Sequence, residues 1–153
     1  MTDSTHELTL DSRPVTRLRY AGTDAFVAES ASGHAIVTGF SHDRPTSPTP
    51  MELVLLALGG CTGADVVSIL AKKRQRVTGY EIEIRADRRE AHPRVYTRIE
   101  VLHRVRGFGV DRAAVEHAVE LSETKYCSVS AMLRATTELV STIEIVDEPS
   151  VAE

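Results

Sequence analysis

The sequence predicts an α+β fold, with mainly antiparallel sheets around one long central helix. Strand-like segments come in groups instead of alternating singly with helices, which favours antiparallel pairing. One long apolar helical segment separates the first group of strands from the second. A chain of 153 residues is most simply a single domain, 1–153, with loose tails at about residues 1–12 and 147–153.

Three short strands are expected near the N-terminus. Turn signals at Ala21–Asp24 and Ser30–Gly33 separate them, because glycine and small polar residues end each strand there. The strands are Val15–Tyr20, Ala25–Glu29 and His34–Thr38. A polar loop with several prolines, Phe40–Pro50, follows them.

The central helix has a clear start. Thr49 suits the N-cap position, Pro50 suits the first helical position, and Glu52 completes a capping box with Thr49. The apolar pattern predicts that the helix continues toward Gln75.

Two glycines stand inside this helix, directly before a cysteine. Gly59 and Gly60 each cost about 1 kcal/mol relative to alanine in a helix interior. We therefore expect either a backbone that packs closely there or an opening of the helix beside Cys61. A further apolar face is formed by Val66, Val67, Ile69 and Leu70. A helix this apolar needs more cover than one small sheet supplies, so we expect a homodimer in which the subunits cover each other's helices.

The second half of the chain predicts a hairpin, two helices and a last strand. Even-numbered residues are apolar in Tyr80–Asp87, and Val95, Ile99 and Val101 continue an odd-numbered register in a second strand that extends to Val105. The polar segment Arg88–Pro93 joins the two strands. After a glycine break, the remaining elements are a helix at Asp111–Tyr126, a short helix at 128–135 capped by Ser128, and a strand at Leu139–Val146.

The composition excludes several classes of function. A formal net charge of −4 does not favour nucleic acid, and the basic run Lys72–Arg76 is expected to be a solvated helix end. Residues 1–14 hold no apolar stretch for a signal peptide, and the apolar run before Cys61 is shorter than the roughly 20 residues of a membrane span. We therefore expect a cytoplasmic protein that binds neither nucleic acid nor a membrane.

Metal and serine-hydrolase chemistry is not predicted. The histidines have no metal-ligand spacing, the two cysteines do not form a Cys-x-x-Cys motif, and no Gly-x-Ser-x-Gly motif occurs. We expect no metal and no cofactor.

Cys61 and Cys127 are the candidate reactive residues. A thiol is nucleophilic only as its thiolate, so it needs a lowered pKa and access to an oxidant. In a reducing compartment a cysteine pair suits a catalytic or sensing role better than a permanent disulfide. The alternative is that both are small, buried and unreactive. Asp65 follows Cys61 by one helical turn, and we expect it to serve the helix surface, because a carboxylate raises the pKa of a nearby thiol.

The segments around both cysteines resemble the OsmC/Ohr family of osmotically inducible and organic-hydroperoxide-resistance proteins. Residues 50–67, PMELVLLALGGCTGADVV, are similar to the family's central helix with its reactive cysteine. His92-Pro93 before a strand, and the segment KYCSVS at 125–130, resemble an OsmC-like branch of YhfA type. The resemblance extends over Val15–Val146.

The resemblance implies an OsmC-like fold, formed as an intertwined α+β homodimer with active sites at the subunit interface, without a cofactor. It also implies a thiol peroxidase that reduces organic hydroperoxides. Cys61 would be oxidised to a sulfenic acid and Cys127 would condense with it to a disulfide, which a lipoyl-type or other dithiol then reduces.

Two positions depart from the family's peroxidase pattern. The family's glutamate, ten residues before the first cysteine, corresponds to Met51, and the family's arginine corresponds to Thr23. Glu52 stands one position later, half a turn out of phase with Cys61 on a straight helix. It is a candidate catalytic residue if the helix is distorted or if it serves the partner's site, and a capping residue otherwise. The alternative function is a redox-sensing or small-hydrophobic-ligand-binding stress protein without efficient turnover.

Overall fold

The computed structural model describes residues 13–41, 43 and 45–149, and it confirms the α+β fold. The chain divides into two compact units, Met1–Leu53 and Val54–Glu153, and each is described by itself. The sequence-based assignment of a single domain stays a prediction.

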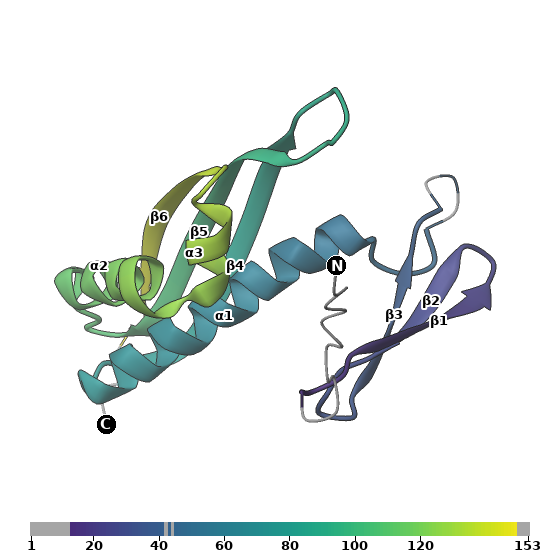
Figure 1. Ribbon diagram of the computed structural model, residues 1–153. Helices are drawn as coiled ribbons and strands as arrows, with labels where there is room; N and C mark the ends of the chain where they lie inside the picture. Colours follow the sequence, from purple (N-terminus) through teal and green to yellow (C-terminus); the bar gives the residue numbers. More distant parts are fainter. Residues whose placement is uncertain (1–12, 42, 44, 150–153) are drawn as a thin grey trace, which may run out of the picture. The chain divides into compact units, whose positions relative to one another are not determined.

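The first unit contains an antiparallel sheet with the strand order β1-β2-β3 (Figure 1). Its strands are β1 (Arg17–Gly22), β2 (Ala25–Glu29) and β3 (Ala35–Gly39), close to the predicted ranges. The loop that follows is tied back to β3, because the Thr38 hydroxyl and the Gly39 N–H each donate to the carbonyl of Pro48 over 3.0 Å. This contact brings the chain to the start of the long helix.

The long helix α1 (Pro50–Lys72) begins with the predicted capping box. The Glu52 carboxylate accepts hydrogen bonds from the backbone N–H of Thr49 at 2.7 Å and from its hydroxyl at 2.8 Å, and the Thr49 hydroxyl accepts from the Glu52 N–H at 3.3 Å. The helix ends at Lys72, three residues before the predicted end. The positive φ of 56° at Arg74 marks the turn into the next strand.

Of the two glycines before Cys61, Gly59 serves close packing, and neither opens the helix. The helix is regular through Gly59 and Gly60, so the expected opening beside Cys61 is wrong. A Cβ atom on Gly59 would lie 3.2 Å from Cδ1 of Ile84 on the next strand, whereas one on Gly60 would meet nothing within 4 Å. Gly59 therefore allows the helix to approach the sheet.

Most of α1 is strongly apolar. The helix has 23 residues and contains an 18-residue stretch with a mean hydropathy of 2.0, so it is long and apolar enough to cross a membrane, although the run before Cys61 alone is too short. Core helices of soluble proteins can have the same length and hydropathy. One stripe of α1 at helical spacing is buried: Leu58, Thr62, Val66 and Leu70.

The second unit is built on a sheet with the order β4-β5-β6. The strands β4 (Arg76–Arg88) and β5 (Tyr96–Phe108) form the predicted antiparallel hairpin. In contrast, β6 (Glu138–Asp147) runs parallel to β5, because the helical segments between them carry the chain back to the same end of the sheet. Asp147, expected in the loose tail, pairs with Gly107, and the residues 1–12 and 150–153 lie outside the described part of the chain.

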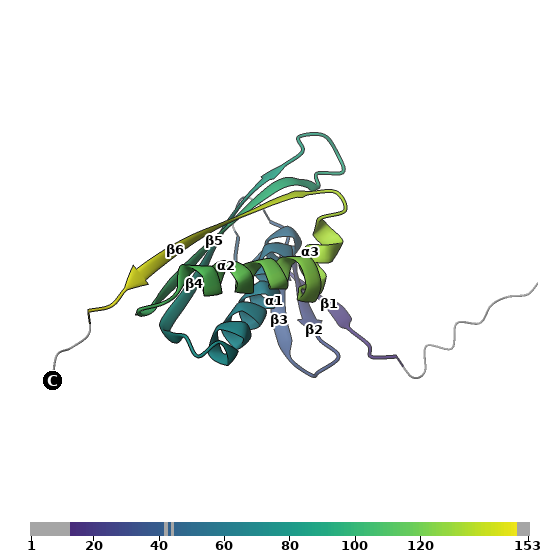
Figure 2. The ribbon, with the colours of Figure 1, turned by 90° about the vertical axis from the view of Figure 1, so that its left-hand side faces the viewer.

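Three helical segments connect β5 to β6: α2 (Arg112–Leu121), the π-helical turn η1 (Ser122–Tyr126) and α3 (Ser128–Leu133). Together with the second-unit part of α1 they lie on one face of the sheet (Figure 2). The core between them is formed by Val66, Leu70, Val105, Val110, Ala114, Val115, Ala118 and Val119. The opposite face of the sheet carries ion pairs of Arg104 with Glu81, Glu83 and Glu144. The cysteines therefore lie on the helical side of the unit.

Candidate functional site: a paired thiol centre

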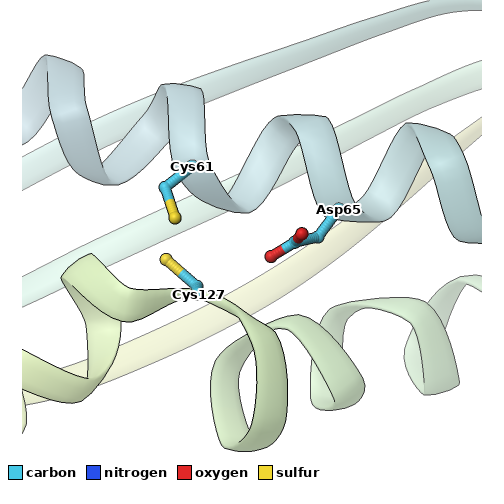
Figure 3. Close-up of side chains that lie close together, drawn as sticks. All are labelled: Cys61, Asp65 and Cys127. Atoms are coloured by element: carbon cyan, nitrogen blue, oxygen red, sulfur yellow. The ribbon is translucent and has the colours of Figure 1, made fainter.

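The two cysteines, 66 positions apart in sequence, meet between α1 and α3. Cys61 projects from the middle of α1 toward Cys127, which joins η1 to α3 (Figure 3). Their sulfur atoms lie within 4.8 Å of each other, and both residues are free thiols. The structure thus brings together the two residues that the sequence singled out.

The π-helical turn positions Cys127. The predicted helix 111–126 ends as α2 at Leu121, and η1 widens the backbone, so that the N–H of Cys127 donates to the carbonyl of Ser122 at 2.8 Å. Cys127 then acts as the N-cap of α3, its sulfur accepting the N–H of Ser130 at 3.3 Å. The predicted cap, Ser128, is instead the first residue of the helix, so that prediction is wrong by one position.

The two thiols differ in exposure. The Cys127 side chain is buried, with 2% of the residue exposed, whereas Cys61 is half-buried. A dissolved oxidant therefore reaches the sulfur of Cys61 more readily than that of Cys127.

The surroundings shift the two thiol pKa values in opposite directions. Burial raises the pKa of Cys61, the thiol of Cys127 adds to this, and the N–H groups of Val129 and Ser128 offset part of it. Burial also opposes the Cys127 thiolate, but hydrogen bonds from Cys61, Ser130 and Thr62 outweigh it and lower the pKa of Cys127. One of them is donated by the Thr62 hydroxyl over 3.5 Å. The surroundings therefore favour the Cys127 thiolate over the Cys61 thiolate.

Asp65 belongs to this centre. Its carboxylate lies within 4.8 Å of both sulfur atoms, and it accepts a hydrogen bond from the buried Ser122 hydroxyl at 2.9 Å (Figure 3). The sequence placed Asp65 on the same helical face as Cys61, and we expected it to serve the helix surface. Its contact with Ser122 is a tertiary contact, which the sequence does not show.

A cleft of about 360 Å³ opens beside Asp65. It is lined by Asp65, Ser68, Ile69, Lys72, Lys73, Leu121 and Tyr126. Its mixture of apolar walls and ammonium groups suits a small molecule that carries a negative charge. The sequence interpretation treated Lys72 and Lys73 only as a helix end.

The other sequence-predicted site positions lie in the first unit. The carboxylate of Glu52 binds Thr49 in the capping box. Met51 lies in the first turn of α1, and Thr23 lies in the turn between β1 and β2 with a φ of 49°. A catalytic role of Glu52 stays a prediction.

Sequence reasoning missed one buried polar pair in the second unit. Tyr80 Oη and His103 Nδ1 lie 2.6 Å apart, and His103 is 0% exposed. Burial raises the pKa of Tyr80 and lowers the pKa of His103, although the charge of Glu123 opposes the latter shift. The sequence pattern does indicate that His103 is buried, because His103 shares the odd-numbered register of the apolar residues of β5.

Comparison with known proteins places the chain in a family. The family model for OsmC-like protein matches residues 41–141. The protein YhfA of Escherichia coli K12 is 44% identical over 131 residues, which cover 85% of this chain and 96% of YhfA.

Solved structures share the fold. A hypothetical protein from Aquifex aeolicus superposes with a TM-score of 0.80 at 36% identity, covering 90% of this chain and 98% of that protein. The organic hydroperoxide resistance protein OhrB of Bacillus subtilis superposes with a TM-score of 0.57 at 16% identity over 86% of this chain and 98% of OhrB, a likeness of fold alone. The extent of the family match and the identity to YhfA establish that the chain belongs to the family of OsmC-like proteins.

Proposed function

We propose that this protein is a cytoplasmic thiol peroxidase that reduces organic hydroperoxides with Cys61 and Cys127. The observation that carries the proposal is the placement of two free thiols within 4.8 Å of each other, one half-buried and one buried. Its fold is shared with proteins named for organic hydroperoxide resistance.

The first step oxidises the more accessible sulfur. Cys61 transfers its proton to the Cys127 thiolate, and the resulting Cys61 thiolate attacks the terminal oxygen of the hydroperoxide. The S–O bond forms as the O–O bond breaks, giving a Cys61 sulfenic acid and an alkoxide that takes up a proton to leave as the alcohol. The alkoxide takes this proton from Cys127, which returns Cys127 to the thiolate that the next step needs.

The second step uses the proximity of Cys127. Its sulfur attacks the sulfenic sulfur of Cys61, an S–S bond forms, and water leaves. A dithiol of lipoyl type then reduces the disulfide by exchange and becomes oxidised itself. One hydroperoxide is thus reduced for each dithiol oxidised.

The proposal includes a homodimer. Large apolar side chains are exposed in both units, among them Leu18, Tyr20, Ile36, Leu56, Val67 and Met132. Exposed apolar side chains of this kind are typical of an interface. Sedimentation equilibrium is expected to give twice the mass of the chain, 2 × 16.7 kDa, and a monomer at micromolar concentration would contradict this part of the proposal.

The peroxidase proposal is tested with purified, reduced protein, tert-butyl hydroperoxide and dihydrolipoamide. We expect hydroperoxide consumption that Cys61→Ser abolishes. Cys127→Ser should still undergo one oxidation, detected as a trapped sulfenic acid at Cys61, but should not turn over. Thr78→Ala, which removes an exposed hydroxyl on β4 outside the cleft beside Asp65, is a control for general effects of substitution. Undiminished turnover by Cys61→Ser would refute the assignment.

One observation favours a second candidate, a redox sensor without efficient turnover. Burial is the largest cause of the raised pKa of Cys61, and no cation is among the described groups that shift this pKa. A thiol with a raised pKa reacts slowly with peroxide. Complete disulfide formation with one equivalent of hydroperoxide, followed by no multiple turnover with dihydrolipoamide, would support the sensor over the peroxidase.

A further inference from the structure

We propose that the reduced protein binds one thiophilic divalent cation, such as Zn²⁺, through Cys61, Cys127 and Asp65. Each of these residues offers one ligand atom, and the two sulfur atoms and one carboxylate oxygen lie within 4.8 Å of one another (Figure 3). Sulfur and carboxylate ligands on a tetrahedral ion are a donor set that suits Zn²⁺.

The three ligands come from two elements that are already held together. Cys61 and Asp65 stand one turn apart on α1, and Cys127 lies at the start of α3. Because the α1 residues are fixed on one helical face, only small side-chain movements are needed to bring the three donors to metal–ligand distances of about 2.0–2.3 Å. The sequence did not reveal the site, because the spacing matches no metal-binding motif.

Outer contacts orient two of the ligands. The Ser122 hydroxyl donates to the Asp65 carboxylate at 2.9 Å, and the Thr62 hydroxyl donates to the sulfur of Cys127 at 3.5 Å. Hydrogen bonds of this kind fix ligand direction and stabilise charged ligands in metal sites.

The cleft beside Asp65 gives access to a fourth coordination position and brings positive charge near the metal site. Three protein ligands leave a fourth tetrahedral position, and the cleft gives water access to the Asp65 side of the cluster. Two thiolates and one carboxylate around a divalent ion carry a net charge of −1, and Lys72 and Lys73 line the same cleft. On binding, the metal replaces the protons still held by the two thiols, which pass to the solvent.

Metal binding and disulfide formation exclude each other, because both use the sulfur atoms of Cys61 and Cys127. The metal site does not depend on the proposed peroxidase, however. A protein that fails to consume hydroperoxide can still bind the metal, and an active peroxidase can fail to do so.

The test is a titration of the reduced full chain with Co²⁺ in anaerobic buffer. We expect a sulfur-to-cobalt charge-transfer band that saturates at one Co²⁺ per chain, and its loss when Zn²⁺ displaces the cobalt. Protein alkylated at both thiols with N-ethylmaleimide should give no band. The absence of the band from the reduced protein would overturn the proposal.

Asp65→Asn tests the carboxylate ligand. We expect it to weaken Zn²⁺ binding by about tenfold or more in competition with a chromophoric chelator. The matched control is Asp87→Asn, which removes an exposed carboxylate from β4 and should bind Zn²⁺ like the unaltered chain. Circular dichroism would establish that both variants are folded, and a count of two reactive thiols would establish that both cysteines are reduced. Equal affinity of Asp65→Asn and Asp87→Asn would overturn the three-ligand site.

Discussion

The hydroxyl of Thr62 donates a hydrogen bond to the sulfur of Cys127 over 3.5 Å, so that α1 contributes directly to the environment of the thiol that caps α3. Thr62 is itself buried and lies one position after Cys61. The helix therefore holds both a partner thiol and a donor for Cys127. A neutral residue that no cysteine motif would identify therefore contributes to the lowered pKa of Cys127.

Replacing Thr62 with valine should raise the pKa of Cys127. Valine keeps the shape of threonine but removes the O–H donor that favours the thiolate. The rate of Cys127 alkylation at neutral pH, followed by peptide mass spectrometry, should therefore fall and its pH profile should move to higher pH. Thr142→Val, at an exposed position of β6, is the matched control. An unchanged profile for Thr62→Val would contradict this account of the Cys127 charge.

Local signals explain why most of the fold was predictable. The helix start depends on Thr49 and Glu52, which are three residues apart, and the strands of the hairpin show the alternation of a half-buried sheet. The parallel pairing of β6 was not predictable in this way, because it depends on the path of three helical segments. The π-helical turn Ser122–Tyr126 was not predictable either, because no periodic pattern of apolar residues marks so short a segment in the sequence.

The candidate site was predictable only in part for the same reason. Cys61 and Cys127 were found from residue type and the family resemblance. Burial raises the pKa of Cys61, whereas hydrogen bonds from Cys61, Ser130 and Thr62 lower the pKa of Cys127. The bonds from Cys61 and Thr62 are contacts between segments far apart in the chain. Asp65 was visible as a neighbour of Cys61, but the contact with Ser122 gave it its half-buried position.

Gly59 and Gly60 should respond differently to alanine. At Gly60 a Cβ meets nothing within 4 Å, so Gly60→Ala should raise the free energy of unfolding by up to about 1 kcal/mol through helix propensity. At Gly59 a Cβ would lie 3.2 Å from Ile84, so crowding should cancel or reverse that gain. Urea denaturation of both variants measures the difference. Destabilisation by Gly60→Ala would indicate that another surface packs there, as a dimer partner would.

Stability should fall in mild acid because of His103. Burial lowers its pKa below the ordinary value of 6.5, so the folded chain resists protonation there. Above about pH 6.5 neither state binds this proton, and below it the unfolded chain binds the proton first. The free energy of unfolding should therefore decrease by at most about 1.4 kcal/mol per pH unit as the pH falls toward the folded-state pKa of His103.

Two variants isolate that effect. His103→Gln should unfold more easily at neutral pH, because it disturbs the contact with Tyr80, but its free energy of unfolding should depend less on pH between 7 and about 5. His117→Gln, at an exposed position of α2, should keep the original pH dependence. If the free energy of unfolding of both variants depends on pH as strongly as that of the unaltered chain, the acid sensitivity arises from other groups.

Thr49 and Glu52 should act as one stabilising unit. Thr49→Ala and Glu52→Ala each break the capping box, so each should lower the melting temperature, and the double variant should lose little more than either single variant. The hydrogen bonds also lower the pKa of Glu52, so this stabilisation is present above the ordinary carboxyl pKa and declines as the pH falls through the lowered one. Thermal denaturation at neutral pH and near pH 3 measures both effects. A capping role predicts that Glu52→Ala, once folded, forms the Cys61–Cys127 disulfide with hydroperoxide as fast as Thr49→Ala does. A much slower reaction in Glu52→Ala alone would instead assign the carboxylate to catalysis.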